Sequence, residues 1–216
     1  MPLMDDKTRE DVRELLKELT GPVKMVVFTQ EFECQLCKET RQIAEEVAEL
    51  NDLIALDVRD FVEDEAYAKA LNIDKIPAIA ILGENDADYG IRFYGIPSGY
   101  EFMSLLEALK LVSNKQADLS EETLKYLDAL QGDLHLQVFV TPTCPYCPSA
   151  VILAHKLAFA SPKVRSDMIE ANEFPHLSMR YNVMGVPRTV INEDTFIEGA
   201  APEQMLLGKL QEAMAG

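Results

Sequence analysis

The amino-acid sequence predicts an α/β protein made of two copies of one module, each a mixed β-sheet flanked by helices. Two observations lead to this prediction. Short apolar segments of strand length alternate with amphipathic segments of helical period along the 216 residues, which is the pattern of a sheet covered on both faces. The order of the segments also occurs twice at nearly constant spacing. Each copy is about a hundred residues long, an ordinary size for one domain.

Matched residues at a fixed offset reveal the duplication. The stretch Leu71–Pro77 resembles Tyr181–Pro187, 110 residues later, and similar matches occur before and after it. A polar connection around residue 115 separates the two copies. We therefore expect an N-terminal domain over residues 1–115 and a C-terminal domain over residues 116–216.

Each copy begins with an amphipathic helix that leads into a buried strand. Leucines at helical spacing predict helices near residues 12–19 and 121–130, and we expect Gly21 and Gly132 to end them. The strands that follow are expected at Val23–Thr29 and Leu134–Val140. A Cys-x-x-Cys motif comes next in both copies and opens a second helix.

The remaining elements follow the motif helix in the same order in both copies. In the first copy we expect a strand at Leu53–Val58, a helix at Glu63–Leu71, strands at Ala78–Leu82 and Ile91–Tyr94, and a closing helix at Gly99–Leu111. In the second copy we expect strands at Thr189–Ile191 and Thr195–Ile197 and a closing helix at Pro202–Met214.

All four cysteines lie in the two motifs, Cys34-Gln35-Leu36-Cys37 and Cys144-Pro145-Tyr146-Cys147. A structural disulfide framework in a small secreted protein spreads its cysteines over distant loops, so the clustering indicates a chemical role. In each copy a proline, Pro77 or Pro187, follows the first cysteine by 43 residues. The equal spacing associates each proline with its motif.

Charge and hydropathy exclude two classes of partner. The net charge of −17 argues against binding to nucleic acid, which needs clustered Lys and Arg. No apolar run approaches the roughly 18 residues of a membrane-spanning helix. The first twenty residues mix charged and apolar side chains and lack the apolar core of a signal peptide. We therefore expect no nucleic-acid partner, no membrane partner and a cytoplasmic location.

A strand, a Cys-x-x-Cys motif at a helix start and an apolar-Pro dipeptide before the next strand resemble the thioredoxin fold, present here twice. The second motif, with its Cys-Pro-Tyr-Cys core, is similar to that of glutaredoxins. Two such modules in tandem resemble the protein disulfide oxidoreductases of thermophilic archaea and bacteria, which are related to protein disulfide isomerase. The resemblance covers nearly the whole chain after the first dozen residues. It implies two tandem thioredoxin-like folds and an enzyme that reduces, forms or isomerises disulfides in protein substrates.

The resemblance also implies roles for the cysteines. Cys34 and Cys144 match the nucleophile, and Cys37 and Cys147 match the resolving cysteine. A helix N-terminus stabilises a thiolate through its free N–H groups and dipole, and the thiolate is the species that attacks disulfides. No dinucleotide-binding glycine motif occurs, so we expect no cofactor and a reductase partner as electron donor.

The prolines and their preceding residues complete the implied sites. Pro77 and Pro187 match the cis-proline that faces the motif. The backbones of Ile76 and Val186 match the segment that pairs with an extended substrate. One feature departs from thioredoxins proper: Phe28 and Val138 occupy the position of their buried aspartate. We therefore do not expect a proton relay through that aspartate.

Three alternatives remain open. The chain is also similar to the paired thioredoxin folds of alkyl hydroperoxide reductase flavoproteins, which carry electrons to a peroxidase, although in that family only the second module keeps its cysteines. A non-catalytic polypeptide-binding adaptor is the second alternative. Structural zinc is the third, but zinc pairs lie about 15–20 residues apart, whereas 106 residues separate Cys37 from Cys144. The net direction of the redox reaction, the natural substrates and the oligomeric state are not determined by the sequence.

We predict that Cys144 has a lower thiol pKa than Cys34 and that its site is the more oxidising. Glu31, Glu33 and Glu39 surround the first motif, whereas residues 141–150 around the second carry no charged side chain. Negative charge opposes ionisation of a thiol. Thiolate absorbance of single-site Cys→Ser variants, followed against pH, measures both values. A lower pKa at Cys34 would contradict the prediction.

Overall fold

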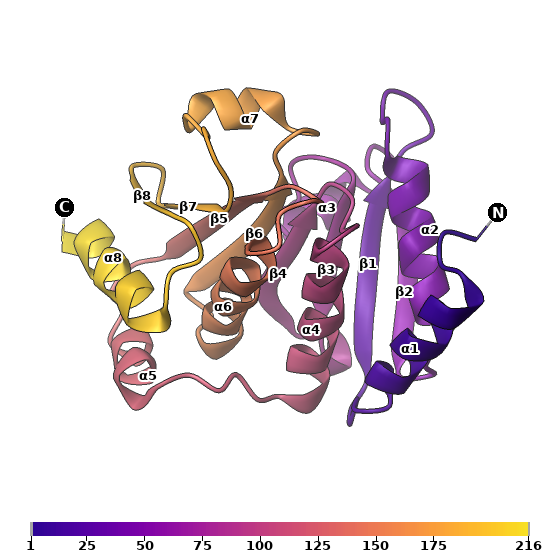
Figure 1. Cartoon of the computed structure of the whole chain (residues 1–216), viewed down its shortest axis with the longest axis horizontal. Coiled ribbons are helices and arrows are strands. Elements are labelled where there is room, and N and C mark those ends of the chain that lie inside the picture. Colours follow the sequence, from indigo (N-terminus) through magenta and orange to yellow (C-terminus); the bar gives the residue numbers. More distant parts are fainter. Residues whose placement is uncertain (1, 216) are drawn as a thin grey trace.

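The computed structural model describes residues 2–215 and confirms an α/β architecture in which the two copies share one sheet (Figure 1). Within this range the sheet has eight strands in the order β2-β1-β3-β4-β6-β5-β7-β8. Each copy contributes four strands in the same internal order. In both copies the strand before the Cys-x-x-Cys motif is parallel to one neighbour and antiparallel to the other. This is the mixed sheet expected for two tandem thioredoxin-like folds.

The helices and strands follow the order expected from the sequence. In the N-terminal copy they are α1 (Asp6–Leu16), β1 (Val23–Thr29), α2 (Cys37–Ala48), β2 (Ile54–Asp60), α3 (Glu65–Ala70), β3 (Ala78–Leu82), the short turn η1 (Glu84–Asp86), β4 (Asp88–Tyr94) and α4 (Glu101–Asn114). In the C-terminal copy they are α5 (Glu121–Asp128), β5 (Leu134–Val140), α6 (Cys147–Ala160), β6 (Val164–Glu170), α7 (Pro175–Arg180), β7 (Arg188–Ile191), β8 (Thr195–Glu198) and α8 (Glu203–Ala215).

The expectation that Gly21 and Gly132 end the first helix of each copy is wrong. α1 ends at Leu16 with Lys17 as its C-cap, and α5 ends at Asp128 with Ala129 as its C-cap. Gly21 instead lies against the end of α4, where its N–H donates to the Ser113 hydroxyl over 3.0 Å. A Cβ at this position would lie 3.1 Å from the Ser113 carbonyl oxygen, so close packing rather than a cap explains the glycine.

Two apolar layers, one on each face of the sheet, form the core. On β1, Met25 and Val27 belong to the layer that contains residues of α1, α2, α4 and α6, whereas Val26 and Phe28 belong to the layer beneath α3 and α7. All four side chains are fully buried. A strand buried on both faces has an unbroken apolar sequence, which explains why β1 and β5 were predictable to the residue.

The copies are joined by parallel pairing of β4 with β6, in register from Ile91 opposite Ser166 to Tyr94 opposite Ile169. The chain itself passes between them through residues 115–120, between α4 and α5. Since the sheet is continuous across the two copies, the division at residue 115 stays a prediction. Within residues 2–215, no helix combines the length and the apolar character that crossing a bilayer requires.

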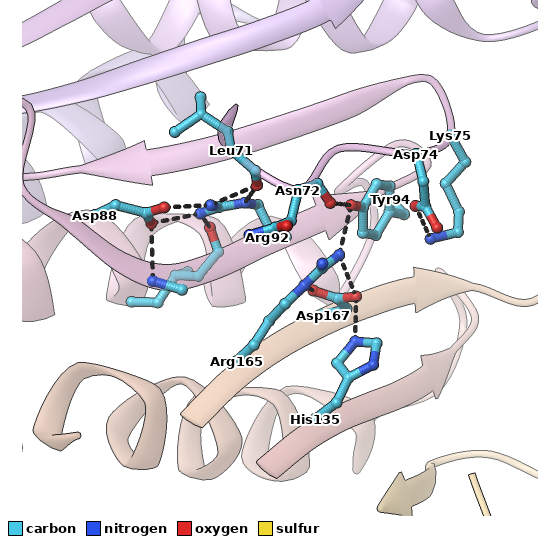
Figure 2. A network of polar contacts seen from close by, with 12 residues as sticks. Leu71, Asn72, Asp74, Lys75, Asp88, Arg92, Tyr94, His135, Arg165 and Asp167 are labelled. Carbon is cyan, nitrogen blue, oxygen red and sulfur yellow. Dashed lines mark hydrogen bonds and ion pairs between the residues drawn. The ribbon is translucent and has the colours of Figure 1, made fainter. Parts of the chain in front are cut away.

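A buried polar network stabilises the junction between β4 and β6 (Figure 2). Asp167 on β6 is fully buried and accepts hydrogen bonds from His135 at 2.6 Å and from Arg165 at 2.8 and 2.9 Å. Arg165 also donates to the Tyr94 hydroxyl of the other copy at 2.8 Å. The Nζ atom of Lys75, in the loop before Pro77, lies 3.8 Å from the centre of the Tyr94 ring. The network therefore connects the second copy to the proline loop of the first.

The ionised form of Asp167 is strongly favoured in this network. Burial alone would raise its pKa, but the hydrogen bond from His135 and the charge of Arg165 lower the pKa of Asp167 to about 2. Its contribution to stability is therefore fully present above about pH 4, near its pKa in the unfolded chain. That contribution is lost as the pH falls toward 2.

We predict that Asp167→Asn lowers the free energy of unfolding by about 3 kcal/mol at neutral pH, because it leaves Arg165 without its buried counter-charge. Asp57→Asn is the matched control, since Asp57 lies 110 residues earlier on the edge strand β2. There it pairs with Arg59, which is partly exposed, so a loss below about 1 kcal/mol is expected. Urea unfolding of both variants measures the difference, and equal losses would contradict the role given to Asp167.

The pH dependence provides a second measurement of the same prediction. Wild type should lose more stability than Asp167→Asn when the pH falls from about 4 to 2, since only wild type has a carboxylate to protonate at residue 167. Parallel slopes for the two proteins over this range would show that Asp167 does not titrate as described.

Candidate redox sites

Both Cys-x-x-Cys motifs lie at the same end of the sheet, after the carboxyl ends of the parallel strands β1 and β5. Each motif forms an internal disulfide, Cys34–Cys37 and Cys144–Cys147, with the Cα atoms 5.5 Å apart in both. Three strands, β3, β4 and β6, lie between β1 and β5. The four cysteines therefore form two separate redox pairs and not one cluster.

The helices begin at the second cysteine of each motif, three residues later than expected. Cys37 and Cys147 are the first residues of α2 and α6 and are buried. Cys34 is partly exposed, whereas Cys144 is only 8% exposed. The leading sulfur therefore lies just outside the helix and is bonded to a sulfur in its first turn, where unpaired N–H groups favour a thiolate.

The resemblance implied a cis-proline in each copy. The Ile76–Pro77 and Val186–Pro187 peptide bonds are both cis. The carbonyl oxygen of Val186 lies 3.7 Å from the Cys144 sulfur, so the segment before Pro187 faces the second motif. The Pro77 carbonyl accepts a hydrogen bond from Gly95 N–H over 2.9 Å. The Pro187 carbonyl accepts the equivalent bond from Gly199 over 2.8 Å, so the two loops are held in the same way.

The surroundings of the first motif are charged. A pocket of about 570 Å³ lies beside Cys34 and is lined in part by Lys38, Arg41 and Arg59. Arg41 pairs with Glu45 at 2.7 Å, and Arg59 pairs with a carboxylate on its own strand. Phe32 is 75% exposed at the edge of this site. A substrate at Cys34 therefore meets ion pairs on one side.

The second motif has a different environment. The uncharged segment expected from the sequence surrounds Cys144, and Tyr146 is 70% exposed within it. Among the residues that the structure describes, no group of three or more histidine, cysteine or acidic side chains has a geometry that would hold a metal ion.

Glu101 is a titratable residue near the second site that sequence reasoning missed. It is the first residue of α4 and is 1% exposed. The neighbouring Tyr100 donates its N–H to the carbonyl of Pro142 over 3.0 Å, two residues before Cys144. α4 then packs along α6, the helix that begins at Cys147. The buried Glu101 therefore follows directly on a residue that is hydrogen-bonded to the segment before the second motif.

The carboxyl group of Glu101 has few hydrogen bonds to offset its burial. One oxygen accepts a hydrogen bond from the Ser104 hydroxyl over 2.6 Å, and the other has no hydrogen-bond partner among the described residues. Burial raises the pKa of Glu101 to about 7, against which the Ser104 bond has little effect. The group can therefore exchange a proton near neutral pH. Its only sequence signal was an acidic residue at a helix start, which is common on protein surfaces.

Glu173 is a second carboxyl group with a raised pKa, and it contacts the first copy. It accepts the N–H of Ile96 over 2.6 Å, next to the Gly95 that donates to the Pro77 carbonyl. Burial, with a smaller contribution from the charge of Glu170, raises the pKa of Glu173 to about 7. Gly95 packs so closely that a Cβ there would lie 2.6 Å from the Cβ of Glu170. The second copy thus holds the proline loop of the first.

Comparison with known proteins shows what the chain resembles. Residues 134–212 match the thioredoxin domain family. Among solved structures, a protein disulfide oxidoreductase from Aeropyrum pernix K1 is 30% identical and aligns over 98% of this chain and 94% of its own, with a TM-score of 0.92. The NTD N/C domain of alkylhydroperoxide reductase AhpF from Enterococcus faecalis is 26% identical over 98% of this chain and 99% of its own, with a TM-score of 0.87.

Longer proteins contain a segment of similar sequence. Alkyl hydroperoxide reductase (its F subunit) from Pseudomonas putida is 26% identical over 208 residues, which cover 96% of this chain and 37% of that protein. The corresponding Escherichia coli K12 protein is 24% identical over the same shares. This chain therefore spans a little over a third of the length of these relatives. Given the 30% identity to the Aeropyrum pernix protein over almost the whole of both chains, the chain belongs to the protein disulfide oxidoreductases of the thioredoxin superfamily and carries two Cys-x-x-Cys motifs, each closed as a disulfide.

Proposed function

We propose that the chain reduces, forms or isomerises disulfides in protein substrates at two sites, Cys34/Cys37 and Cys144/Cys147. One observation supports this above all: each copy closes a pair of sulfurs at the start of a helix, and in the second copy the carbonyl of Val186 lies beside the leading sulfur. The pairs are separate, so each can complete an exchange alone. We place the activity in the cytoplasm, where thiols are kept reduced.

In the reducing direction, the thiolate of Cys144 attacks one sulfur of a substrate disulfide. An S–S bond forms between Cys144 and the substrate, and the other substrate sulfur leaves as a thiolate that takes up a proton. The Cys147 sulfur then attacks Cys144, forms the internal disulfide and releases the second substrate thiol. Two electrons pass to the substrate, and a reductase partner restores the dithiol. Cys34 and Cys37 perform the same steps at the first site.

Glu101 is proposed as the proton acceptor for Cys147. The resolving thiol is buried and must lose its proton before it attacks. The thioredoxin aspartate position of the second copy is Val138, so the proton acceptor must come from another element. Glu101 is buried beside this site and has a pKa near 7, which suits a general base at neutral pH.

Substrate polypeptide is proposed to bind along the proline loops. The backbones of Ile76 and Val186 precede the cis-prolines, and the Val186 carbonyl lies beside the Cys144 sulfur. An extended segment that hydrogen-bonds to this backbone would present its cysteine to the motif, as an added strand does at a sheet edge. Pro77 and Pro187 fix the direction of the two loops.

A second candidate function is electron transfer to a peroxidase. The relatives named as F subunits of alkyl hydroperoxide reductase match 96% of this chain, which favours a carrier role. The charged pocket at Cys34 and the uncharged surroundings of Cys144 suit two different partners, one that donates electrons and one that accepts them. In this role the two sites would work in series, whereas in the first each site turns over alone.

We predict that each site alone supports insulin reduction and reactivation of scrambled ribonuclease. The variants are Cys34→Ser/Cys37→Ser, Cys144→Ser/Cys147→Ser and the protein without all four thiols. With dithiothreitol as donor, each double variant should keep a substantial part of the wild-type rate, and the quadruple variant should have none. Activity that survives loss of all four thiols would favour a non-catalytic adaptor. Loss of all activity in both double variants would favour sites that work in series.

We predict that Glu101→Gln lowers the reaction rate of the second site on the order of tenfold near pH 8. This is less than a positioned general base usually contributes, because water can also accept the thiol proton. The rate is measured in the Cys34→Ser/Cys37→Ser background. Wild-type Glu101 is protonated below its pKa of about 7 and ionised above it. The wild-type rate should therefore rise through pH 7, and the rate of the variant should lack this rise. Glu107→Gln, on the same helix and paired with Lys110, is the control. An unchanged pH profile in Glu101→Gln would refute the proposed role.

A further inference from the structure

The hydroxyl of Thr40 is buried beside the first redox site without a hydrogen bond. Thr40 lies on α2, three residues after Cys37, and is 0% exposed. Its Oγ1 atom has no hydrogen-bond partner among the residues that the structure describes. A buried hydroxyl normally has a partner, because its removal from water without one is unfavourable. The missing partner of Thr40 therefore needs an explanation.

The place of Thr40 on α2 brings its side chain close to Cys37. Four buried residues at spacings of three and four form a stripe along one side of the helix: Cys37, Thr40, Ala44 and Val47. On a helix, residues three apart have Cβ atoms about 5–6 Å apart, and side chains lean toward the preceding turn. The turn that precedes Thr40 begins at Cys37. Of the four side chains, only that of Thr40 carries a hydroxyl, and it leans toward the turn that holds the sulfur.

The redox state of the site accounts for the unbonded hydroxyl. Cys37 is bonded to Cys34 in this structure, and a disulfide sulfur has no hydrogen to donate and is a weak acceptor. In the dithiol state, the Cys37 thiol can donate to the hydroxyl, and its thiolate is a charged acceptor that binds a hydroxyl donor strongly. Breaking the S–S bond also leaves the Cys37 side chain free to rotate about χ1. Thr40 thus gains a partner when the site is reduced.

The second copy provides an internal comparison. At an offset of 110 residues, Cys37 corresponds to Cys147 and Thr40 to Ala150, which is 7% exposed on α6. The same buried position in the fold is therefore compatible with alanine, so packing alone does not require threonine at residue 40. The first copy also has Phe28 at the position of the thioredoxin aspartate. Its resolving cysteine therefore needs a polar group from another residue.

We infer that the Thr40 hydroxyl is hydrogen-bonded to the Cys37 sulfur when the first site is reduced and thereby favours the dithiol over the disulfide. The inference rests on the proposed function and adds a residue that sets the redox equilibrium of the first site. When Cys37 attacks Cys34 of a mixed disulfide, the Cys34–substrate bond breaks and the Cys34–Cys37 bond forms. The substrate sulfur leaves with the proton that Cys37 has lost. The hydrogen bond to Thr40 is lost in this step, so Thr40 makes the first disulfide a stronger oxidant.

The experiment measures the redox equilibrium of the first site in the Cys144→Ser/Cys147→Ser background. The protein is equilibrated at pH 7 with mixtures of reduced and oxidised glutathione, and free thiols are trapped with a maleimide that changes the gel mobility. Thr40→Val removes the hydroxyl and keeps the shape of the side chain. It should shift the equilibrium about threefold to tenfold toward the disulfide, as loss of one hydrogen bond allows, which lowers the potential by about 15 to 30 mV. Thr40→Ser keeps a hydroxyl and should restore the original equilibrium.

Two further variants keep the inference testable if Thr40→Val disturbs folding. Ala150→Ser, in the Cys34→Ser/Cys37→Ser background, places a hydroxyl at the matching position of the second site and should shift that site toward the dithiol. Ser166→Ala is the matched control, since Ser166 on β6 also has a buried hydroxyl without a partner among the described residues. Its removal should leave the redox equilibrium of the first site unchanged. An equal shift in Ser166→Ala would overturn the inference.

The outcomes separate this inference from the proposed function. If the protein with only the first site neither exchanges with glutathione nor reduces insulin, the proposed function fails at this site and the inference fails with it. If it does both and Thr40→Val leaves the equilibrium unchanged, the proposed function stands and only the inference is refuted. Urea unfolding of Thr40→Val gives a second check. Equal changes in the stability of the oxidised and reduced forms would show a partner that does not depend on the redox state, such as a buried water, and would overturn the inference.

Discussion

The pairing of β4 with β6 determines the arrangement of everything else in this protein. Within residues 2–215 it is the one strand contact between the copies, and it turns two four-stranded sheets into one. Since the pairing is parallel, both Cys-x-x-Cys motifs come to lie at the same end. It also brings Glu101 beside the second motif and Glu173 beside the first proline loop. Near both sites, therefore, a segment of one copy is hydrogen-bonded to the other copy.

Comparison of the two copies separates the backbone features that both share from the side chains that differ between them. The cis-proline loops and the hydrogen bonds that hold them are the same in both copies. The side chains around the motifs are not: charged residues line the pocket at Cys34, whereas residues 141–150 around Cys144 carry no charged side chain. The two sites thus share a backbone framework and differ in the charge of their surroundings.

The features that depend on a local residue pattern could be predicted from the sequence. β1, β3 and β5 are buried on both faces, so their apolar runs were visible and their bounds were correct. β2 ends with charged residues, and its last two residues were therefore missed. The motif spacing identified the redox pairs because the chemistry needs two sulfurs within one helical turn.

Features that depend on contacts between the copies were not predictable. Glu101 begins a helix of the first copy, and nothing in its local sequence relates it to Cys144. The joining of the two sheets was also hidden, because an edge strand that pairs with another copy has the same alternation as one that ends a sheet. The glycines after the first helices were assigned to caps by analogy, although close packing against α4 explains Gly21.

The contact that joins the two copies can also form between separate chains, and the outer strands of the sheet disfavour it. A module whose β4 edge fits the β6 edge of its duplicate has, at β8 and β2, the corresponding edges still open, and repetition of the contact from chain to chain would produce a filament. β8 is only four residues long and ends at Glu198, and β2 carries Arg59 where β6 carries Ile169. Short strands and charged side chains disfavour pairing at an edge. Growth by sheet extension is thus confined to the single junction within the chain.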